Sequence, residues 1–232
     1  MVKYAFIPSR DGKSQTLIKL KTFLEKANFV VKVLVGESSI FEAYSNAIKE
    51  ANVSAQDWVI LCHDDIEIIN SVDSFTDILN THFKKPNAGF LGVAGARVLT
   101  HQAVWWGNYS AEHQPLSQNN TMRGAVFHGV DMETAVLDVF GRHGKAVVLD
   151  GVFLACKGAV LNSIQITQPK TFTSGWHFYD IFFTYQAFKK GYINVAAPIM
   201  LRHESVGTPE GSYEDNRKAF VDHFGGDLPV QV

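Results

Sequence analysis

Three side chains that could bind a metal ion stand together in the sequence as His63, Asp64 and Asp65. They follow directly on an apolar run, Trp58–Cys62, whose composition predicts a buried β-strand. An imidazole and two carboxylates at a strand end are costly to remove from water, and a divalent cation would offset that cost. Taken alone, the triplet fits equally well a loop whose carboxylates are solvated or cap the next segment.

The elements that must position this triplet alternate between short apolar runs and amphipathic stretches. This alternation is typical of βα units on a mostly parallel sheet, in which ligands collect beyond the carboxyl ends of the strands. The sequence therefore predicts a Rossmann-like central sheet flanked by helices. The predicted elements are a strand over Lys3–Pro8, a helix over Ser14–Ala27, a buried strand over Phe29–Val35, a helix from Ser38 or Ser39 to Ala51, the strand Trp58–Cys62 and a helix near Val72–Lys84.

The second half of the chain departs from this alternation, because strand-like pieces follow one another without helices between them. We expect hairpins there, and hence a mixed or antiparallel second half. A helix around His177–Lys190 and a strand-like run to Leu201 follow. The polar segment Ser110–Gly124 lacks periodicity and predicts a mobile surface loop. The strand-like pieces are Gly89–Ala94, Val104–Tyr109, Ala125–His128, Thr134–Phe140, Ala146–Leu149 and Asp150–Cys156.

Composition limits the classes of partner. The chain has 232 residues, of which 46% are hydrophobic and 19% charged, so it can bury a sizeable core. Its formal net charge of -2 disfavours nucleic acid or an anionic membrane as partner. The first apolar run is too short for a secretory leader or a transmembrane segment, so we expect a cytoplasmic protein. No internal repeat or linker is evident, and residues 1–232 are predicted to form a single domain.

Seven short segments stand in a characteristic order along the chain. They are Ile-Pro-Ser-Arg (7–10), Phe-Glu-Ala-Tyr-Ser-Asn-Ala-Ile (41–48), Val-Ile-Leu-Cys-His-Asp-Asp-Ile (59–66), Gly-Val-Ala-Gly (92–95), Asp-Gly-Val-Phe-Leu-Ala (150–155), Phe-Tyr-Asp (178–180) and His-Glu-Ser-Val-Gly (203–207). Taken together, they resemble bacterial nucleotide-sugar glycosyltransferases of the GT-A fold, with family-2-like motifs. The resemblance extends from Lys3 to about Gly207 and implies a nucleotide-binding half over 1–100, an acceptor-binding half over 101–207 and a C-terminal tail over 208–232.

This resemblance gives the acidic cluster a specific role. The family has a DxD motif at this point, and Asp65 matches its last carboxylate, which holds Mn²⁺ or Mg²⁺ across the diphosphate. His63 stands where the family has the first Asp, so it binds either the metal or the nucleotide, and Asp64 is left to contact the ribose. His203 resembles the histidine that many members add to the metal. Independently of the family, a diphosphate leaves readily only when a cation or hydrogen-bond donors neutralise its charge.

The resemblance also assigns a general base. Asp180 matches the aspartate that removes the acceptor proton in inverting members, although an acid at a helix N-terminus is common for structural reasons. Many members carry another acid two residues later, where this chain has Phe182. The residues implied for the base and ribose pocket are Pro8, Ser9, Arg10, Glu37, Asn46 and Asp64, and Asp150 is implied for the donor sugar. Independently of the resemblance, the flat ring of Trp176 is a candidate for stacking on a donor or acceptor sugar, with Trp105 and Trp106 as further candidates.

The resulting hypothesis is a metal-dependent, inverting hexosyltransferase that uses a UDP-sugar and an unknown acceptor hydroxyl, in cell-surface polysaccharide or glycolipid synthesis. Arg202, Arg217 and Lys218 are expected to bring positive charge to the diphosphate. Either segment 110–124 or segment 208–217 is expected to become ordered when the donor binds. Two alternatives stay open: a non-catalytic nucleotide or nucleotide-sugar-binding protein on the same fold, and a nucleotidyltransferase, although the glycine-rich, lysine-bearing first loop of that class is missing. A Rossmann dehydrogenase is disfavoured because no Gly-x-Gly-x-x-Gly follows the first strand.

Overall fold

A seven-stranded sheet forms the centre of the protein, whose computed structural model describes residues 1–106, 121–205 and 211–232. Its strand order is β10-β13-β5-β12-β3-β1-β2. Five of these strands run in one direction, and β12 and β10 run against them. The strands are β1 (Lys3–Ser9), β2 (Val30–Val35), β3 (Trp58–Cys62), β5 (Ala88–Gly92), β10 (Gly144–Ala146), β12 (Phe153–Lys157) and β13 (Ile193–Ala196). The predicted α/β class with a mostly parallel sheet and a mixed second half is confirmed.

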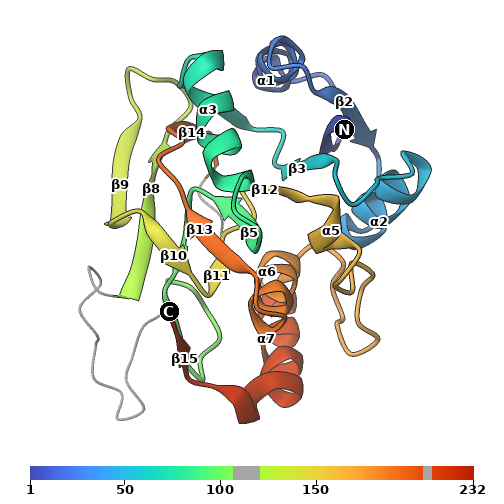
Figure 1. Ribbon diagram of the computed structural model, residues 1–232, viewed down its shortest axis with the longest axis vertical. Coiled ribbons are helices and arrows are strands. Elements are labelled where there is room, and N and C mark those ends of the chain that lie inside the picture. The colour runs from blue at the N-terminus through green and yellow to red at the C-terminus, as the bar shows by residue number, and fades with distance from the viewer. Residues whose placement is uncertain (107–120, 206–210) are drawn as a thin grey trace.

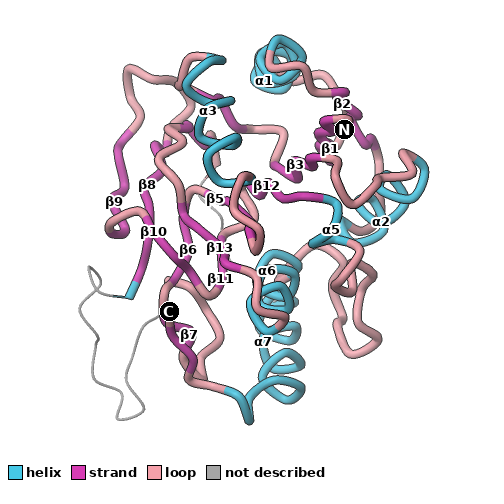
Figure 2. Tube along the Cα trace, viewed as in Figure 1, coloured by secondary structure: helices cyan, strands magenta, loops and turns pink. Residues whose placement is uncertain are grey.

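Helices lie against this sheet (Figure 1, Figure 2). The first three begin at serine caps, because the hydroxyls of Ser14, Ser39 and Ser71 accept backbone N–H groups of the first turn. The helices are α1 (Gln15–Lys26), α2 (Ile40–Glu50), α3 (Val72–Phe83), α5 (Gly158–Leu161), α6 (Tyr179–Lys189) and α7 (Gly211–Phe224), followed by a short 3₁₀ turn at Gly225–Asp227. Within the described ranges, no helix has the length and apolar character needed to cross a membrane.

A second sheet, of order β11-β6-β8-β14-β4, brings distant parts of the chain together. Its strands are β4 (Ile66–Ile68), β6 (Ala94–Ala96), β8 (Met122–His128), β11 (Val148–Leu149) and β14 (Leu201–His203), and β9 (Val136–Gly141) pairs with β8. A third, two-stranded sheet joins β7 (Val98–Leu99) to β15 (Val230–Gln231). β14, which ends at His203, lies between β4, to which it is antiparallel, and β8, to which it is parallel.

The residues predicted to be a C-terminal tail contain a packed helix. The ring of Phe178, just before α6, lies 5.2 Å from the rings of both Tyr213 and Phe220 on α7, and Tyr185 of α6 lies 5.3 Å from Phe220. Phe220 is fully buried. Figure 1 accordingly shows α6 and α7 side by side at one end of the molecule.

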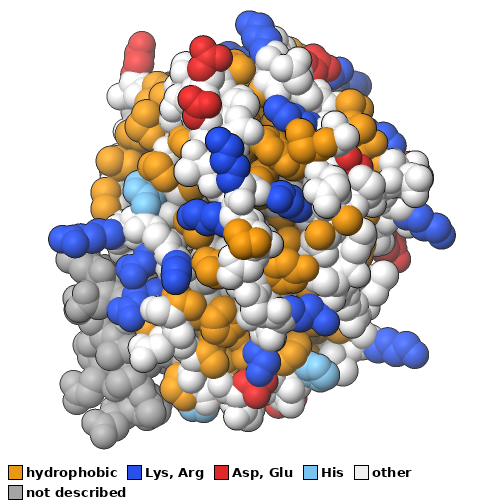
Figure 3. Space-filling view, in the orientation of Figure 1, with side chains coloured by type: hydrophobic (Ala, Val, Ile, Leu, Met, Phe, Trp, Pro, Cys, Tyr) orange, Lys and Arg blue, Asp and Glu red, His pale blue; other side chains and the backbone are white. Residues whose placement is uncertain are grey.

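Two further expectations are corrected or left without a description. Phe29–Val35 was expected to form a buried strand, but β2 is the edge strand of its sheet, and Val30 and Val35 are 50% and 54% exposed. Residues 104–106 form no strand, while 107–120, which contain most of the predicted loop, lie outside the described residues, as do 206–210. β9 is partly exposed to solvent, because its Val136 and Val139 side chains are 64% and 66% exposed. Hydrophobic side chains accordingly lie along the side of the molecule that β9 occupies (Figure 3).

Candidate active site

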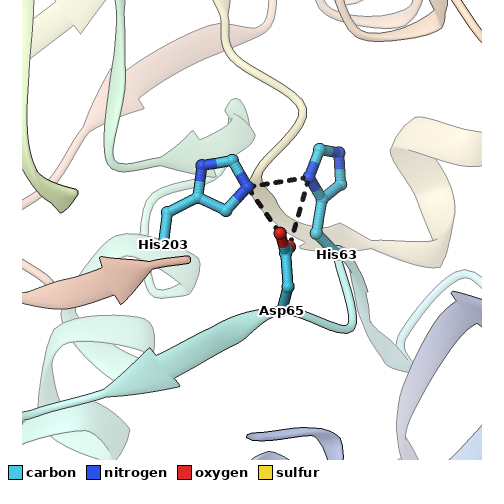
Figure 4. Close-up of side chains that lie close together, drawn as sticks. All are labelled: His63, Asp65 and His203. Atoms are coloured by element: carbon cyan, nitrogen blue, oxygen red, sulfur yellow. Dashed lines mark hydrogen bonds and ion pairs between the residues drawn. The ribbon is translucent and has the colours of Figure 1, made fainter. Parts of the chain in front are cut away.

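Three potential metal ligands from distant parts of the chain meet at one end of the central sheet (Figure 4). Nε2 of His203 lies 3.2 Å from Oδ1 of Asp65 and 3.4 Å from Nδ1 of His63. Nδ1 of His63 lies 3.9 Å from the same Asp65 oxygen. One ligand atom from each residue falls within 4.8 Å of the others, so the three can face a single divalent cation.

Strand pairing explains how these residues meet. β3 ends at Cys62, and the turn that follows carries His63 and Asp65 before β4 begins at Ile66. His203 pairs with Ile66 in the antiparallel ladder between β14 and β4, and the N–H of Glu204 donates to the carbonyl of Asp65 at 3.0 Å. The ligand-bearing ends of both segments therefore lie side by side.

The Tyr179 hydroxyl fixes how the His63 imidazole is oriented. This hydroxyl donates to the carbonyl of Gly151 at 3.1 Å, so its oxygen is left to accept a hydrogen bond from Nε2–H of His63, also at 3.1 Å. That tautomer leaves the Nδ1 lone pair of His63 directed at His203 and Asp65. An imidazole held by its second nitrogen in this way is the usual arrangement of a metal-binding histidine.

The charge states of the triad also suit a cation. Burial would raise the pKa of Asp65, but hydrogen bonds from His203 and from the Ser205 hydroxyl, 2.6 Å from Oδ2, outweigh it and hold that pKa well below its usual range. Burial, with a smaller contribution from His203, lowers the pKa of His63. At neutral pH the triad therefore offers an ionised carboxylate and a neutral imidazole, the forms that bind metals.

The triad lines a cavity of about 980 Å³. Nine of the twelve residues predicted for the site line it, and they come from both halves of the chain. They are Pro8, Arg10, His63, Asp64, Asp65, Asp150, Trp176, Asp180 and His203. The cavity is therefore large enough for a nucleotide with an attached sugar.

The other three predicted residues lie outside this cavity. The Ser9 hydroxyl accepts the N–H of Gly12 at 3.1 Å, which gives Ser9 a structural role in the loop after β1. Asn46 is exposed because it lies on the face of α2 opposite the buried face. Glu37 lies in the partly exposed turn between β2 and α2.

Asp180 stands in the first turn of α6, where Oδ2 accepts the N–H of Gly151 at 3.0 Å. Burial, together with the nearby charge of Asp150, raises the pKa of Asp180 to about 7. Asp150 is itself held in place, since its carboxylate accepts Nε1–H of Trp105 at 2.9 Å and the N–H of Val152 at 2.8 Å. A carboxyl whose pKa lies near neutrality is suited to accept a proton from a hydroxyl.

The backbone around Asp180 is unusually constrained. Phe178, the residue before α6, has φ of 71°, a left-handed conformation that is rare for a bulky residue. A side chain at position 151 would collide with the Tyr179 hydroxyl, so the turn after Asp150 requires glycine. Tyr179 and Asp180 both contact the turn that carries Asp150, because each hydrogen-bonds the backbone of Gly151.

Several cavity residues were not predicted. Ser205 and Tyr179 lie within segments of the resemblance and contact the triad directly, so their place in those segments was the available signal. Nothing in the sequence pattern singled out His128 of β8 or Asp138 of β9, whose Nδ1 and Oδ2 atoms lie 2.6 Å apart. The His128 ring centroid lies 5.8 Å from that of His203.

The expected source of positive charge for a diphosphate is not confirmed. Among described Lys and Arg residues, only Arg10 lines the cavity. Arg202 is buried and paired with Glu67 and Glu204, Arg217 is paired with Glu214, and Lys218 lies 4.0 Å from Glu214. A bound cation would therefore supply most of the charge that neutralises a diphosphate here.

Comparison with solved structures gives the class of fold. GalNAc-T7 with UDP, GalNAc and Mn²⁺ is similar at a TM-score of 0.53 and 11% identity, over 97% of this chain and 48% of that chain, so this protein spans about half of that chain's length. A197 from STIV matches at TM-score 0.45 and 14% identity, covering 88% of this chain and 83% of that one. CMP:2-keto-3-deoxy-manno-octonic acid synthetase with CTP matches at a TM-score of 0.40 and 10% identity, over 98% of this chain and 100% of that chain. The protein has a GT-A-type fold.

The family follows from the sequence match. Residues 20–224 match the family described as a glycosyltransferase like family. Because the match includes most of the chain, the protein belongs to this family, and the resemblance found in the sequence is confirmed. No curated protein matches the chain.

Proposed function

We propose that the protein transfers a sugar from a metal-bound UDP-sugar to an acceptor hydroxyl, with inversion at the sugar carbon. One observation carries this proposal: the triad of His63, Asp65 and His203 and the carboxyl of Asp180 line the same cavity. A cation site suits a diphosphate, and a separate carboxyl suits the acceptor. The family and fold support glycosyl transfer as the reaction class.

The donor set of the triad favours Mn²⁺ over Mg²⁺. Mg²⁺ prefers oxygen ligands and keeps several waters, whereas two imidazoles and one carboxylate suit a transition metal better. When bound, the metal would neutralise the charge that the diphosphate gains as the sugar bond breaks. The presence of UDP, GalNAc and Mn²⁺ in the similar GalNAc-T7 structure supports uridine and manganese for this chain as well.

The remaining cavity residues fit the parts of a nucleotide-sugar. Pro8 lies near the end of β1 and Arg10 directly follows that strand, where the resemblance implies the nucleotide, and Arg10 can pair with a phosphate. Asp64 is available for ribose hydroxyls. Trp176 is 45% exposed at the cavity, so its ring can stack on a sugar, with Asp150 beside the sugar hydroxyls.

Asp180 would act as general base. The acceptor oxygen forms a bond to the sugar carbon, the bond from that carbon to the diphosphate oxygen breaks, and its electron pair leaves with UDP. The acceptor proton moves to Oδ1 or Oδ2 of Asp180, whose pKa of about 7 lets it accept the proton near neutral pH. We propose a hydroxyl of a cell-surface polysaccharide or glycolipid as acceptor, on the ground of the resemblance alone.

The test is a thermal-shift titration of UDP with Mn²⁺ and with chelator, on the wild type, Asp65→Asn and the control Asp222→Asn. Asp222 is exposed and does not line the cavity. UDP at about 100 times its Kd stabilises a folded protein by about 2.7 kcal/mol. We expect this gain only with metal, and only in the wild type and the control. Equal stabilisation in chelator would contradict the metal site, and UDP-sugar that is never converted to a glycosylated product would favour a non-catalytic binding protein.

A further inference from the structure

Arg202 lies beside the metal triad but does not line the cavity. Its side chain is 2% exposed and reaches three segments that border the site. Nη2 lies 2.9 Å from Oε2 of Glu67, and Nη1 donates to the carbonyl of Gly129 at 2.8 Å. Both terminal nitrogens also lie within 3.5 Å of Oε1 of Glu204. One guanidinium therefore joins β4, the end of β14 and the residue after β8.

These three segments are the ones that carry or border the triad. Glu67 lies two residues after Asp65, Glu204 lies one residue after His203, and Gly129 lies where β8 ends, with its N–H donating to the carbonyl of His203 at 3.1 Å. Because side chains alternate along a strand, Arg202 points away from the cavity where His203 points into it. β14 thus presents a potential metal ligand, His203, on one face and Arg202 on the other. We call the contacts of the Arg202 guanidinium with Glu67, Glu204 and Gly129 the clamp.

The backbone pairing alone is a weak constraint on this arrangement. β4 and β14 have three residues each and pair as Leu201 with Ile68, Arg202 with Glu67 and His203 with Ile66. A slip of one residue would move the His203 side chain to the opposite face. Only three residue pairs hold this register between the two strands. A side-chain clamp across the pair removes that freedom.

We propose that Arg202 is a positioning residue for the metal site: its guanidinium holds the register of β14 against β4 and so sets His203 opposite Asp65. This inference rests on the proposed function for the identity of the site. It replaces the expectation that Arg202 neutralises the diphosphate, because Arg202 does not line the cavity and its Nε, Nη1 and Nη2 atoms all donate to Glu67, Gly129 or Glu204.

The clamp is anchored to the first helix as well. The hydroxyl of Thr16 on α1 donates to Oε1 of Glu204, and Nζ of Lys19 lies 3.8 Å from Oε1 of Glu67. Each of the two carboxylates thereby has a partner besides Arg202. Loss of the guanidinium would leave two carboxylates facing each other without their shared cation, and they would separate.

The experiment compares the wild type with Arg202→Met, Arg202→Lys and the control Arg217→Met. Arg217 likewise binds a carboxylate, Glu214 at 2.7 Å, and a carbonyl, Gln102 at 2.9 Å, but it contacts no residue of the triad. Mn²⁺ affinity is measured by electron paramagnetic resonance with the metal alone. The ¹⁵N shifts of the imidazoles are recorded in metal-free protein, because they report the hydrogen bond from His203 to Asp65.

We expect Arg202→Met to weaken Mn²⁺ binding by about 10- to 100-fold, the range found for residues that orient metal ligands. Arg202→Lys keeps the charge and hence the fold, but it lacks the planar fork, so we expect an intermediate loss. The imidazole shift of His203 should move in both variants and stay constant in Arg217→Met. If Arg202→Met proves unfolded, Arg202→Lys decides the question.

Two results would overturn the clamp: Mn²⁺ affinity in folded Arg202→Met or Arg202→Lys equal to that of the wild type, or a His203 shift that does not change. A merely structural arginine would lower the melting temperature without either effect, as we expect for Arg217→Met. Absence of Mn²⁺ binding by the wild type would instead refute the proposed metal site. In that case the imidazole shifts still decide whether Arg202 positions His203.

Discussion

Replacement of Asp180 by asparagine should make the protein more stable at alkaline pH. The carboxyl of Asp180 is partly buried next to Asp150, and its pKa rises from 3.8 to about 7 for that reason. Ionisation of this carboxyl therefore lowers the free energy of unfolding. Asparagine has nearly the same shape and can still accept the N–H of Gly151, which lies 3.0 Å from Oδ2, but it cannot ionise.

The sign and size follow from proton linkage. Between pH 4 and pH 7 the folded state binds more protons at Asp180 than the unfolded state does, so the free energy of unfolding falls as pH rises through this window. The rise of the Asp180 pKa from 3.8 to about 7 corresponds to about 4 kcal/mol. Water reaches a partly buried carboxylate and lowers this figure, so we expect Asp180→Asn to be more stable than the wild type by roughly 2–4 kcal/mol at pH 8. The difference should approach zero near pH 4.

The measurement is urea denaturation of both proteins at pH 4, 6 and 8, with Asp222→Asn as a control for loss of an exposed carboxylate. The control should follow the wild type at each pH. A difference between Asp180→Asn and the wild type that stays constant from pH 4 to pH 8 would refute the raised pKa. It would also remove the reason for choosing Asp180 as the base. The same variant should lose transfer activity by about a hundredfold or more.

Two further variants test the supports of the cavity. Tyr179→Phe removes the hydroxyl that orients the His63 imidazole. This variant should keep the fold and weaken Mn²⁺ binding by about tenfold, as measured by electron paramagnetic resonance. Unchanged Mn²⁺ affinity would show that Tyr179 does not set the tautomer of His63. Asn216→Ala removes a fully buried side chain that hydrogen-bonds the backbone of Thr173, Ser174 and His177. The free energy of unfolding, measured by urea denaturation, should fall by about 2–4 kcal/mol. A loss below about 1 kcal/mol would show that these hydrogen bonds do not support the segment.

The helices of the first half could be predicted because their signals are local. Ser14, Ser39 and Ser71 each precede an apolar pattern of helical spacing, and each caps a helix in the structure. The local signal of α7 is weaker, because of its fourteen residues only Asn216 and Phe220 are buried. Its contacts come from aromatic rings on α6, which a local pattern does not reveal.

The site could be predicted only in part, for a related reason. The residues of the triad were named from motif order, but their contact depends on the pairing of β4 with β14, which joins segments about 140 residues apart through three residue pairs. The role of Arg202 depends on the same pairing. Its charge suggested a phosphate contact, whereas alternation along β14 turns it to the opposite face from His203. A residue's type thus indicated chemistry, while the register decided where that chemistry lies.

The start of α6 differs from those of α1, α2 and α3 in its cap and its backbone conformation. α1, α2 and α3 begin at serines whose hydroxyls satisfy free N–H groups, whereas α6 begins at Phe178, which offers no side-chain cap and has φ of 71°. Strain of this kind costs about 1–3 kcal/mol. Two residues later comes Asp180, a carboxyl whose ionisation the folded state disfavours. Tyr179, between Phe178 and Asp180, bonds the carbonyl of Gly151 and Nε2 of His63 through its hydroxyl. Both features lie in one turn at the wall of the cavity that the triad lines, and they support the proposal that this turn positions Asp180 as a base and, through Tyr179, orients the His63 imidazole.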